Sequence, residues 1–308
     1  MIEATEPNPP AQTWKLTLAY DGTNFRGWQV QPGERTVQGE LQSALGRITG
    51  ESPLPQGSGR TDAGVHALAQ VASFELHVPI PAENLRMALN RTLPASIRVL
   101  ETRIVQSTFH ARHSAVAKTY EYRVFLEKPA PWPDLHAPSK VCPPFLAPYV
   151  CPYPWPLNLD SLQKSASAFL GEHDFRSFAA SEPDLATRRL DAEFKLEAEA
   201  VLSPRPLPRP GFTPEPPRSL TMRTIYSSSW ETRPTVDGLL QVYRVRGSGF
   251  LHHMVRNLVG TMLDVGRGLF RVEEIPAMLA ARQRAAAGAT APARGLFLVS
   301  VEYDGAED

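Results

Sequence analysis

The chain has few of the features that tie a protein to an oxidising compartment, a membrane or a metal. Only two cysteines occur in 308 residues, Cys142 and Cys151, which is too few for a disulfide framework or a cysteine-based zinc site. The sequence has no run of 18 apolar residues and no leading basic-then-apolar segment, so we expect no membrane span and no secretion signal. These absences predict a protein of the reducing cytoplasm.

The chain also has no net charge, because 32 basic residues balance 32 acidic residues. Nucleic-acid-binding domains usually carry a basic excess, so the composition gives that class no support. It does not exclude the class, since an acidic back face can offset a basic groove. The glycine-rich stretch at 57–67 has neither the dinucleotide-binding spacing nor the Gly-Lys-Ser/Thr of a phosphate loop. We therefore expect no nucleotide cofactor.

The apolar periodicities predict an α+β chain, and its length suggests two domains. Alternating apolar residues predict strands at 14–20, 71–78, 97–104, 118–126, 223–232, 239–247 and 295–303. Apolar residues at helical spacing predict helices at 36–50, 82–93, 160–170, 250–265 and 272–286. Thr36 is the expected cap of the first helix, and Gly50 its end. The pattern fits two similar halves, with helices on one face of a mostly antiparallel sheet.

Proline is concentrated in one part of the chain, because 18 of the 30 prolines lie between Pro129 and Pro217. They form two clusters, at 129–156 and 204–217. This density is incompatible with a helix or a central strand, so we interpret both clusters as extended surface excursions. The first cluster roughly marks the boundary between the halves. The stretch at 190–201, between the clusters, fits a short helix or a strand equally well.

The stretch at 57–67, Gly-Ser-Gly-Arg-Thr-Asp-Ala-Gly-Val-His-Ala, places Asp62 two residues after Arg60 in a glycine-rich loop. Its three glycines allow positive φ and the close approach of a ligand. A carboxylate beside a guanidinium stays ionised, which suits a nucleophile or a base. Most glycine-rich turns that carry an aspartate are structural, so this pattern alone does not establish a catalytic role.

Two further segments mix basic, aromatic and amide side chains in the way that RNA-contacting loops do. Residues 21–29 read Asp-Gly-Thr-Asn-Phe-Arg-Gly-Trp-Gln, and residues 109–122 interleave aromatic and basic residues. The first segment also fits a turn with two buried aromatic side chains. The second also fits a strand with exposed basic residues. Both alternatives remain open.

Adjacent histidines, His252 and His253, open the helix predicted at 250–265. On a helix they would point about 100° apart and could not hold one metal ion as an i, i+4 pair does, so we predict no metal site. Arg256 would lie on the same face as His252. A charge within an apolar helix needs a carboxylate partner, because an unpaired buried charge is costly.

Five segments, taken in order, closely resemble the bacterial tRNA pseudouridine synthase A family. The stretch at 57–67 is the most specific, and the others are 20–28, 109–122, 250–257 and 291–303. The resemblance covers nearly the whole chain. It departs at 181–222, where family members pass more directly to the next strand, and in the longer first proline-rich excursion. These departures affect the domain edges and the RNA-contacting periphery but leave the motifs intact.

The resemblance implies an α+β fold of two ferredoxin-like halves whose antiparallel sheets join around a central RNA-binding cleft. We expect a disordered start at 1–11, an N-terminal half at 12–114 that carries the Asp62 loop, and a C-terminal half at 115–304. Proline-rich insertions are expected in the second half near 129–156 and 181–221. The resemblance also implies a homodimer that binds the anticodon stem-loop of tRNA. The implied reaction converts uridines 38, 39 and 40 of tRNA to pseudouridine without a metal or an organic cofactor.

The resemblance also assigns roles to single residues. Asp62 matches the catalytic carboxylate, as the nucleophile that attacks the sugar or as the base that removes its C2′ proton; the sequence leaves the choice open. Tyr120 matches the tyrosine that stacks on the uracil and shuttles the C5 proton. Arg256 is similar to the arginine that pairs with the carboxylate and would lower its pKa. Arg60 is similar to the arginine that fills the space left by the flipped base. The residues expected to hold phosphates are Arg26, Arg112 and Lys118.

Two other classes of function are alternatives to a tRNA-modifying isomerase. A non-catalytic RNA-binding protein could keep the fold, but loss of Asp62, Tyr120 or Arg256 would favour it, and all three are present. A carboxylate-dependent glycoside hydrolase usually needs two carboxylates at a defined separation. Only one acidic residue stands out in the motifs, which disfavours that class.

Overall fold

The structure, a computed structural model, describes residues 10–127, 141–180, 220–236 and 238–305. The chain divides into two compact units, which we call unit 1 and unit 2. Unit 1 comprises Met1–Pro156, Tyr226–Gly249 and Ala291–Asp308, and unit 2 comprises Leu157–Ile225 and Phe250–Thr290. The halves expected at 12–114 and 115–304, and their ferredoxin-like form, stay a prediction.

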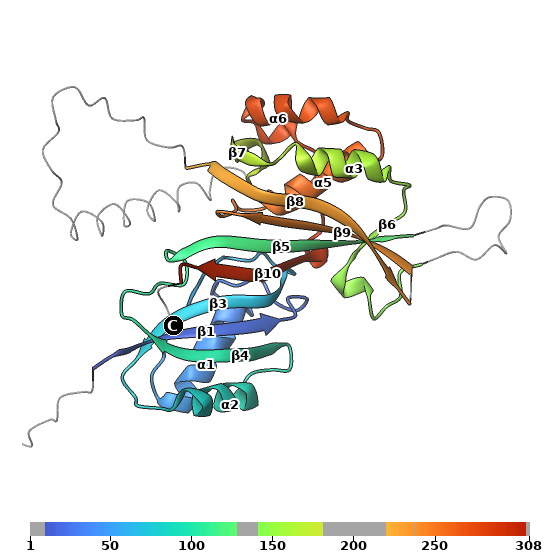
Figure 1. The fold of residues 1–308 in the computed structure, drawn as a ribbon. Helices are drawn as coiled ribbons and strands as arrows, with labels where there is room; N and C mark the ends of the chain where they lie inside the picture. The colour runs from blue at the N-terminus through green and yellow to red at the C-terminus, as the bar shows by residue number, and fades with distance from the viewer. Residues whose placement is uncertain (1–9, 128–140, 181–219, 237, 306–308) are drawn as a thin grey trace, which may run out of the picture. The chain divides into compact units, whose positions relative to one another are not determined.

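Unit 1 is a mixed α+β unit built on one large sheet (Figure 1). Its strands follow the order β4-β1-β3-β10-β5-β9-β8. Their bounds are β1 Gln12–Tyr20, β3 His66–Leu76, β4 Ile97–Val105, β5 Ala115–Leu126, β8 Met222–Thr235, β9 Gly238–Gly247 and β10 Leu296–Tyr303. Strand β8 begins in unit 2 and continues into unit 1 after Ile225. Strand β1 pairs antiparallel with β3 and β4, and β5 pairs antiparallel with β10 and β9. Strands β10 and β3 run parallel.

The first helix of unit 1, α1 (Val37–Thr49), has the ends that the sequence predicted. The Thr36 hydroxyl accepts a hydrogen bond from the Gly39 amide at 3.3 Å, which satisfies one of the amides that a helix start leaves without a partner. Gly50 ends the helix with a φ of 76°, a left-handed conformation that glycine adopts without strain. The second helix, α2 (Ala82–Thr92), packs against both β4 and α1.

Strand β1 confirms the alternation found in the sequence. In this strand Trp14, Leu16, Leu18 and Tyr20 are buried, as expected when successive side chains point to opposite faces of a sheet. Strand β3 differs from its prediction, because it begins at His66, five residues before 71. The alternation is hidden there, since small and polar residues such as Ala67 and Gln70 are buried in place of large apolar ones.

Unit 2 combines a short strand pair with helices. Strand β7 (Gly171–Asp174) pairs antiparallel with the start of β8. Helix α3 (Leu159–Ser167) packs against α5 (Met254–Gly266). Their close approach depends on Gly266, because a Cβ atom at that position would lie 2.9 Å from Cδ2 of Leu157 and 3.0 Å from Cδ2 of Leu162. Helix α6 (Ile275–Ala281) completes the α-helices described in unit 2.

Two helix predictions in unit 2 are wrong at their ends. Helix α5 begins at Met254 and not at 250, because His253 has a φ of 60° and cannot continue a right-handed helix. The helix predicted at 272–286 is broken into α6 and the two 3₁₀ turns that flank it, Val272–Glu274 and Arg284–Ala286. The chain leaves α6 through Arg282, which has a φ of 51°, and the next amide, of Gln283, donates a hydrogen bond to Ser177 Oγ at 2.9 Å.

The first proline-rich cluster is described from residue 141 onward, and there it is only partly a surface excursion: Val141, Phe145 and Trp155 are exposed, but the segment between them joins the sheet. A 3₁₀ turn (Ala147–Tyr149) leads into β6 (Cys151–Tyr153), which pairs parallel with β5. Val150 is fully buried in a cluster with residues of β5 and β9. Pro152 is tolerated in β6 because a strand paired on one side leaves other amides without ladder partners. The remainder of this cluster, the second cluster and the stretch at 190–201 lie outside the described residues.

No helix within the described residues is long and apolar enough to cross a membrane.

Candidate active site

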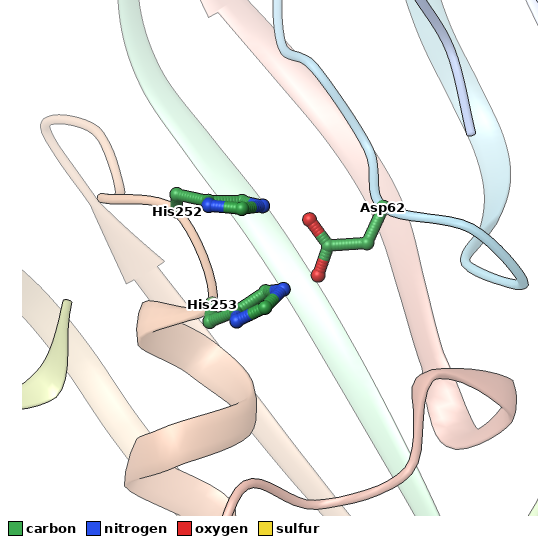
Figure 2. Close-up of side chains that lie close together, drawn as sticks. All are labelled: Asp62, His252 and His253. Atoms are coloured by element: carbon green, nitrogen blue, oxygen red, sulfur yellow. The ribbon is translucent and has the colours of Figure 1, made fainter. Parts of the chain in front are cut away.

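Asp62 lies in unit 1, on the loop between the short strand β2 (Gln56–Gly57) and β3 (Figure 2). Its side chain is partly exposed. The loop turns back directly after Asp62, where the Val65 amide donates a hydrogen bond to the Asp62 carbonyl at 3.1 Å. Gly64 occupies this turn with a φ of 77°, which would strain any other residue. The turn presents the carboxylate at a fixed point of the backbone.

The other two glycines of the loop serve a different purpose from the one that the sequence suggested. Positive φ occurs in this loop only at Gly64. At Gly57 a Cβ atom would lie 2.5 Å from Cε2 of Trp28, so the missing side chain gives space to the indole ring. At Gly59 a Cβ atom would lie 3.5 Å from the Tyr120 hydroxyl. The missing side chain at Gly57 therefore permits close packing at the base of the loop, whereas a Cβ atom at Gly59 would make an ordinary contact.

The segment at 21–29 supports the Asp62 loop from behind. The Trp28 amide donates a hydrogen bond to the Thr61 carbonyl at 3.0 Å, and the Gly64 amide donates to the Phe25 carbonyl at 3.3 Å. Phe25 and Trp28 are only 3% and 2% exposed, so their rings form part of the core. Of the two interpretations that the sequence left open, the turn with buried aromatic side chains is confirmed.

Polar side chains within the sheet tie down the remainder of the loop. The hydroxyls of Tyr20 and Thr61 lie 2.8 Å apart, and burial raises the pKa of Tyr20 above its usual value. Ser58 Oγ donates to Gln70 Oε1 at 2.7 Å, and Gln70 Nε2 donates to the Gly59 carbonyl at 2.8 Å. Buried polar groups with such partners hold one conformation, because breaking a bond would leave a donor or acceptor unsatisfied.

Two predicted site residues on β5 reach the base of the same loop. Tyr120 is 8% exposed, and its hydroxyl lies beside Gly59. Lys118, two residues earlier and therefore on the same face of the strand, donates a hydrogen bond from Nζ to the Ser58 carbonyl. Unit 1 thus brings together the Asp62 loop, the Tyr120 hydroxyl and the Lys118 ammonium.

A buried carboxylate follows Tyr120 along β5, and its two arginine partners make it unsuited to act as a general acid. Glu121 is 4% exposed, with Oε1 2.8 Å from Arg123 Nε and Oε2 3.5 Å from Arg233 Nη2. Burial alone would raise the pKa of Glu121, but the hydrogen bond and charge of Arg123, with Arg233, lower it below its usual range. A general acid needs a raised pKa. Glu121 also alternates to the opposite face of the strand from Tyr120.

The other basic residues predicted for the site lie in different surroundings. Arg60 is exposed on the Asp62 loop. Arg26 is exposed and pairs with Glu34, with Nε 3.2 Å from Oε2. The Arg112 amide donates to His110 Nδ1 at 3.1 Å, in the turn between β4 and β5. Their contacts with RNA stay predictions.

Arg256 and the two histidines belong to unit 2. Arg256 is half-buried in the first turn of α5. Since Asp62 belongs to unit 1, the ion pair between Asp62 and Arg256 stays a prediction. The rings of His252 and His253 lie 4.0 Å apart between centroids (Figure 2). Both precede α5, so the prediction that they open a helix, with His252 on the face of Arg256, is wrong.

Sequence reasoning gave no role in the site to three residues that lie together at the start of β3: His66, Asp21 and Tyr149. His66 lies four residues after Asp62 in the same glycine-rich stretch, and this proximity was the only available signal. Asp21 was assigned to a turn. Nothing in the sequence connects Tyr149, 128 residues from Asp21, with this site, although its hydroxyl donates a hydrogen bond to Asp21 Oδ2 at 2.9 Å.

Comparison with known proteins confirms the resemblance found in the sequence. Residues 17–114 and 211–304 match the family model described as tRNA pseudouridine synthase, and the chain belongs to this family. Among its curated relatives are proteins named tRNA pseudouridine synthase A. The chain is 47% identical to the protein of this name from Solibacter usitatus over 290 residues, 40% identical to that from Bacillus pumilus over 292 residues and 39% identical to that from Bacillus subtilis over 292 residues. Each comparison covers 94% of this chain and 98% of the relative.

Proposed function

We propose that this protein is a tRNA pseudouridine synthase that isomerises uridines 38, 39 and 40 in the anticodon stem-loop of tRNA. The observation that carries the proposal is the Asp62 loop of a chain of this family, which holds one carboxylate in a fixed turn. The base of this loop lies beside the Tyr120 hydroxyl and accepts a hydrogen bond from the Lys118 ammonium. Family membership gives the class of reaction, an isomerisation on tRNA. The positions that are modified are part of the proposal.

The reaction breaks the N1–C1′ bond of uridine, turns the base and joins C5 to C1′. The C5 proton is lost and N1 gains a proton, so atoms and electrons balance without an oxidant or a reductant. One carboxylate suffices for the sugar chemistry. Asp62 either attacks C1′ and displaces the base, or removes the C2′ proton and leaves a double bond between C1′ and C2′.

Tyr120 is the proposed partner of the base. An aromatic ring at the floor of the site can stack on the uracil, and the hydroxyl can accept the proton that C5 releases. Its burial supports this role, because a site that excludes water limits side reactions. A target base within a stem must first leave its stack, at a cost of a few kcal/mol. We propose that Arg60 fills the space that the base vacates.

The proposed tRNA contacts extend the site. Arg256 would hold Asp62 in its ionised form and so lower its pKa. The exposed or partly exposed basic side chains Arg26 and Arg112 would contact phosphates, with Lys118 contributing at the edge of the loop. Two ferredoxin-like halves of each chain around a central RNA-binding cleft, assembly into a homodimer and a cytoplasmic location complete the proposal.

Tritium release tests this proposal. The substrate is an anticodon stem-loop that carries tritium at C5 of the target uridines, and the variants are Asp62→Ala and Asp62→Asn. Both should release no tritium, whereas wild-type protein and the control Asp160→Asn, which alters an exposed carboxylate in the first turn of α3, should release it. Release by either Asp62 variant would contradict the catalytic role. Absence of release by wild-type protein from any tRNA would contradict the function itself.

A second measurement separates the two roles of Asp62. Removal of the C2′ proton predicts a primary isotope effect when C2′ carries deuterium, because that bond then breaks in the reaction. Attack at C1′ leaves the C2′–H bond intact and predicts none. The outcome assigns Asp62 as base or as nucleophile.

A further inference from the structure

We propose that His66 is a positioning residue for the Asp62 turn, and that Asp21 and Tyr149 support the same Gly22 backbone beside it. The inference rests on the proposed function for its catalytic consequence. It concerns residues of unit 1 that touch the backbone of the site and have no assigned role. Every contact that carries it lies within that unit.

The His66 ring occupies a closed site behind the loop. His66 is the first residue of β3, and its side chain is 2% exposed. The ring stacks on Phe297, with centroids 4.6 Å apart and planes inclined by 20°. Phe297 is the residue that pairs with His66 where β10 runs parallel to β3. The ring is therefore fixed by packing, and its nitrogens point in fixed directions.

Each ring nitrogen has a backbone partner. The Gly22 amide donates to Nδ1 at 3.1 Å, so Nδ1 accepts and carries no proton. The ring proton then lies on Nε2, which is 3.1 Å from the Pro148 carbonyl and 3.2 Å from that of Arg294. One neutral ring thus joins four segments of the chain. Burial, the largest influence, lowers the pKa of His66, in agreement with a neutral ring.

The bond from Gly22 connects this ring with the Asp62 turn. A Cβ atom at Gly22 would lie 2.0 Å from the carbonyl oxygen of Val65, so the backbone of Gly22 lies directly against that of Val65. Val65 closes the turn through its hydrogen bond to the Asp62 carbonyl. By holding Gly22 in place, His66 prevents the Val65 peptide from moving and fixes the start of the turn that carries the carboxylate.

Asp21 and Tyr149 extend this support. Asp21 Oδ1 lies 3.2 Å from His66 Nδ1 and accepts hydrogen bonds from the Thr23 amide at 3.0 Å and the Thr23 hydroxyl at 2.6 Å. Asp21 Oδ2 accepts from the Tyr149 hydroxyl, and the Tyr149 ring lies 5.3 Å from the His66 ring. Tyr149 lies in the described part of the first proline-rich cluster. This assigns a role in the site to a segment in which the sequence predicted only a surface excursion.

The test uses variants that retain one nitrogen function at a time. His66→Asn keeps an acceptor near the position of Nδ1, and His66→Gln keeps a donor near the position of Nε2. If the Gly22 bond positions the turn, His66→Gln should lower the single-turnover rate of tritium release about 10- to 100-fold. His66→Asn should lose less activity. The affinity for tRNA should stay unchanged in both, because the binding surface is intact.

The variant Tyr149→Phe provides a second test of the proposal. Alone, it should lower the single-turnover rate about fivefold, the equivalent of one lost hydrogen bond. Combined with His66→Gln it should cause less than the multiplicative loss, because both side chains act on the same Gly22 backbone. Independent, multiplicative losses would contradict the link between the two residues.

A matched control separates positioning from stability. Asn90 joins α2 to β4 in the same unit through two hydrogen bonds to Val99, of 2.8 and 2.9 Å, away from the Asp62 loop. Asn90→Ala should lower stability while leaving the single-turnover rate unchanged below the unfolding transition. If His66→Gln keeps the wild-type rate, or loses activity only as much as Asn90→Ala does, the proposal is wrong.

Amide hydrogen exchange tests the positioning role of His66 independently of activity. His66→Gln should accelerate exchange at Gly22 and Val65 and leave the amides of α2 unchanged. Unchanged exchange at both sites would overturn the positioning role even if activity fell. If wild-type protein releases no tritium from any tRNA, the proposed function fails, and this exchange measurement alone decides on His66.

Discussion

The Lys118 ammonium donates a hydrogen bond to the backbone carbonyl of Ser58, four residues before Asp62 in the chain. This bond ties β5, which also carries Tyr120, to the base of the Asp62 loop. A lysine predicted from the sequence to contact phosphates thus has a partner within the protein. Support of the loop and contact with a phosphate are two different roles for Lys118, and they make different predictions.

If Lys118 supports the loop, Lys118→Gln should slow catalysis without altering the salt dependence of binding. Hydrogen bonds to charged groups contribute about 1.5–3 kcal/mol, so the single-turnover rate should fall at least about tenfold. The slope of log affinity against log salt should stay at the wild-type value. A phosphate contact would instead reduce that slope by roughly 0.7–0.9. Arg112→Gln is the control in which this reduction is expected.

Tyr120→Phe should keep tRNA binding and lose most of the catalysis. The ring remains for stacking, but the hydroxyl proposed to receive the C5 proton is absent, and general acid–base groups contribute about 10²–10⁴-fold. Tritium release and filter binding measure the two effects separately. Tyr243→Phe is the control, because it also removes a buried hydroxyl, one that lies 2.8 Å from Ser228 Oγ. Equal losses in both variants would argue against a chemical role for Tyr120.

Gly27 and Gly33 form a matched pair for the support behind the loop. Both have positive φ, of 96° and 75°, so alanine strains either position by roughly 1–2 kcal/mol. At Gly27 the added Cβ would also lie 2.6 Å from the Thr61 carbonyl oxygen, whereas at Gly33 it would meet no described atom within 4 Å. Gly27→Ala should therefore displace the Asp62 loop and reduce activity, and Gly33→Ala should reduce only stability. Thermal unfolding and tritium release measure these outcomes.

The stability of unit 1 should decrease in mild acid because of His66. Burial lowers the pKa of His66 below its value of 6.5 in the unfolded chain, although Asp21 opposes the shift and Arg123 adds to it. The unfolded state then binds more protons, so the free energy of unfolding falls as the pH drops through about 6.5. Tyr149 also faces the ring but stays neutral in this range. In His66→Asn the free energy of unfolding should no longer show this decrease between about pH 7 and pH 5. Denaturant titrations at several pH values measure the difference.

Asp21 should affect stability only at lower pH. Burial alone would raise its pKa, but hydrogen bonds from Thr23 and Tyr149 and the nearby His66 lower it below 3.8. Its contribution is therefore present above that value and is lost as the pH falls further. The two contributions to the free energy of unfolding fall in different pH ranges. In His66→Asn the upper one should disappear and the lower one should persist but shrink, because the hydrogen bonds from Thr23 and Tyr149 remain and the charge of His66 is lost.

The sequence predicted best the features that local chemistry determines. Helix α1 has its cap at Thr36 and its end at Gly50, both of which short-range hydrogen bonding and backbone conformation decide. The start of α5 could not be predicted in this way. His253 adopts a left-handed conformation at a turn where the His252 carbonyl accepts a hydrogen bond from the Ala180 amide, more than 70 residues earlier in the chain. No local pattern records such a contact.

The same distinction applies to the candidate site. Asp62 and Tyr120 were predicted because they match motifs of a known family, and their catalytic roles stay predictions. The contacts that His66, Lys118 and Tyr149 make around the loop were not predicted, since their partners are distant in sequence. Lys118 itself was predicted only as a phosphate contact. Phe25 and Trp28 show the converse, because side chains of a type suited to RNA contact belong to the core.

Strand β10 has a consequence for synthesis of the protein. Among the described strands it alone lies between β3, which follows the Asp62 loop, and β5, which carries Tyr120. Residues 296–303 are made about 170 residues after β5, at a translation rate near 5–20 residues per second. For many seconds the nascent chain therefore contains β3, with the Asp62 loop before it, and β5, with Tyr120, but not the strand that joins β3 to β5. A chain still on the ribosome, surrounded by tRNA, has no assembled site until this strand emerges.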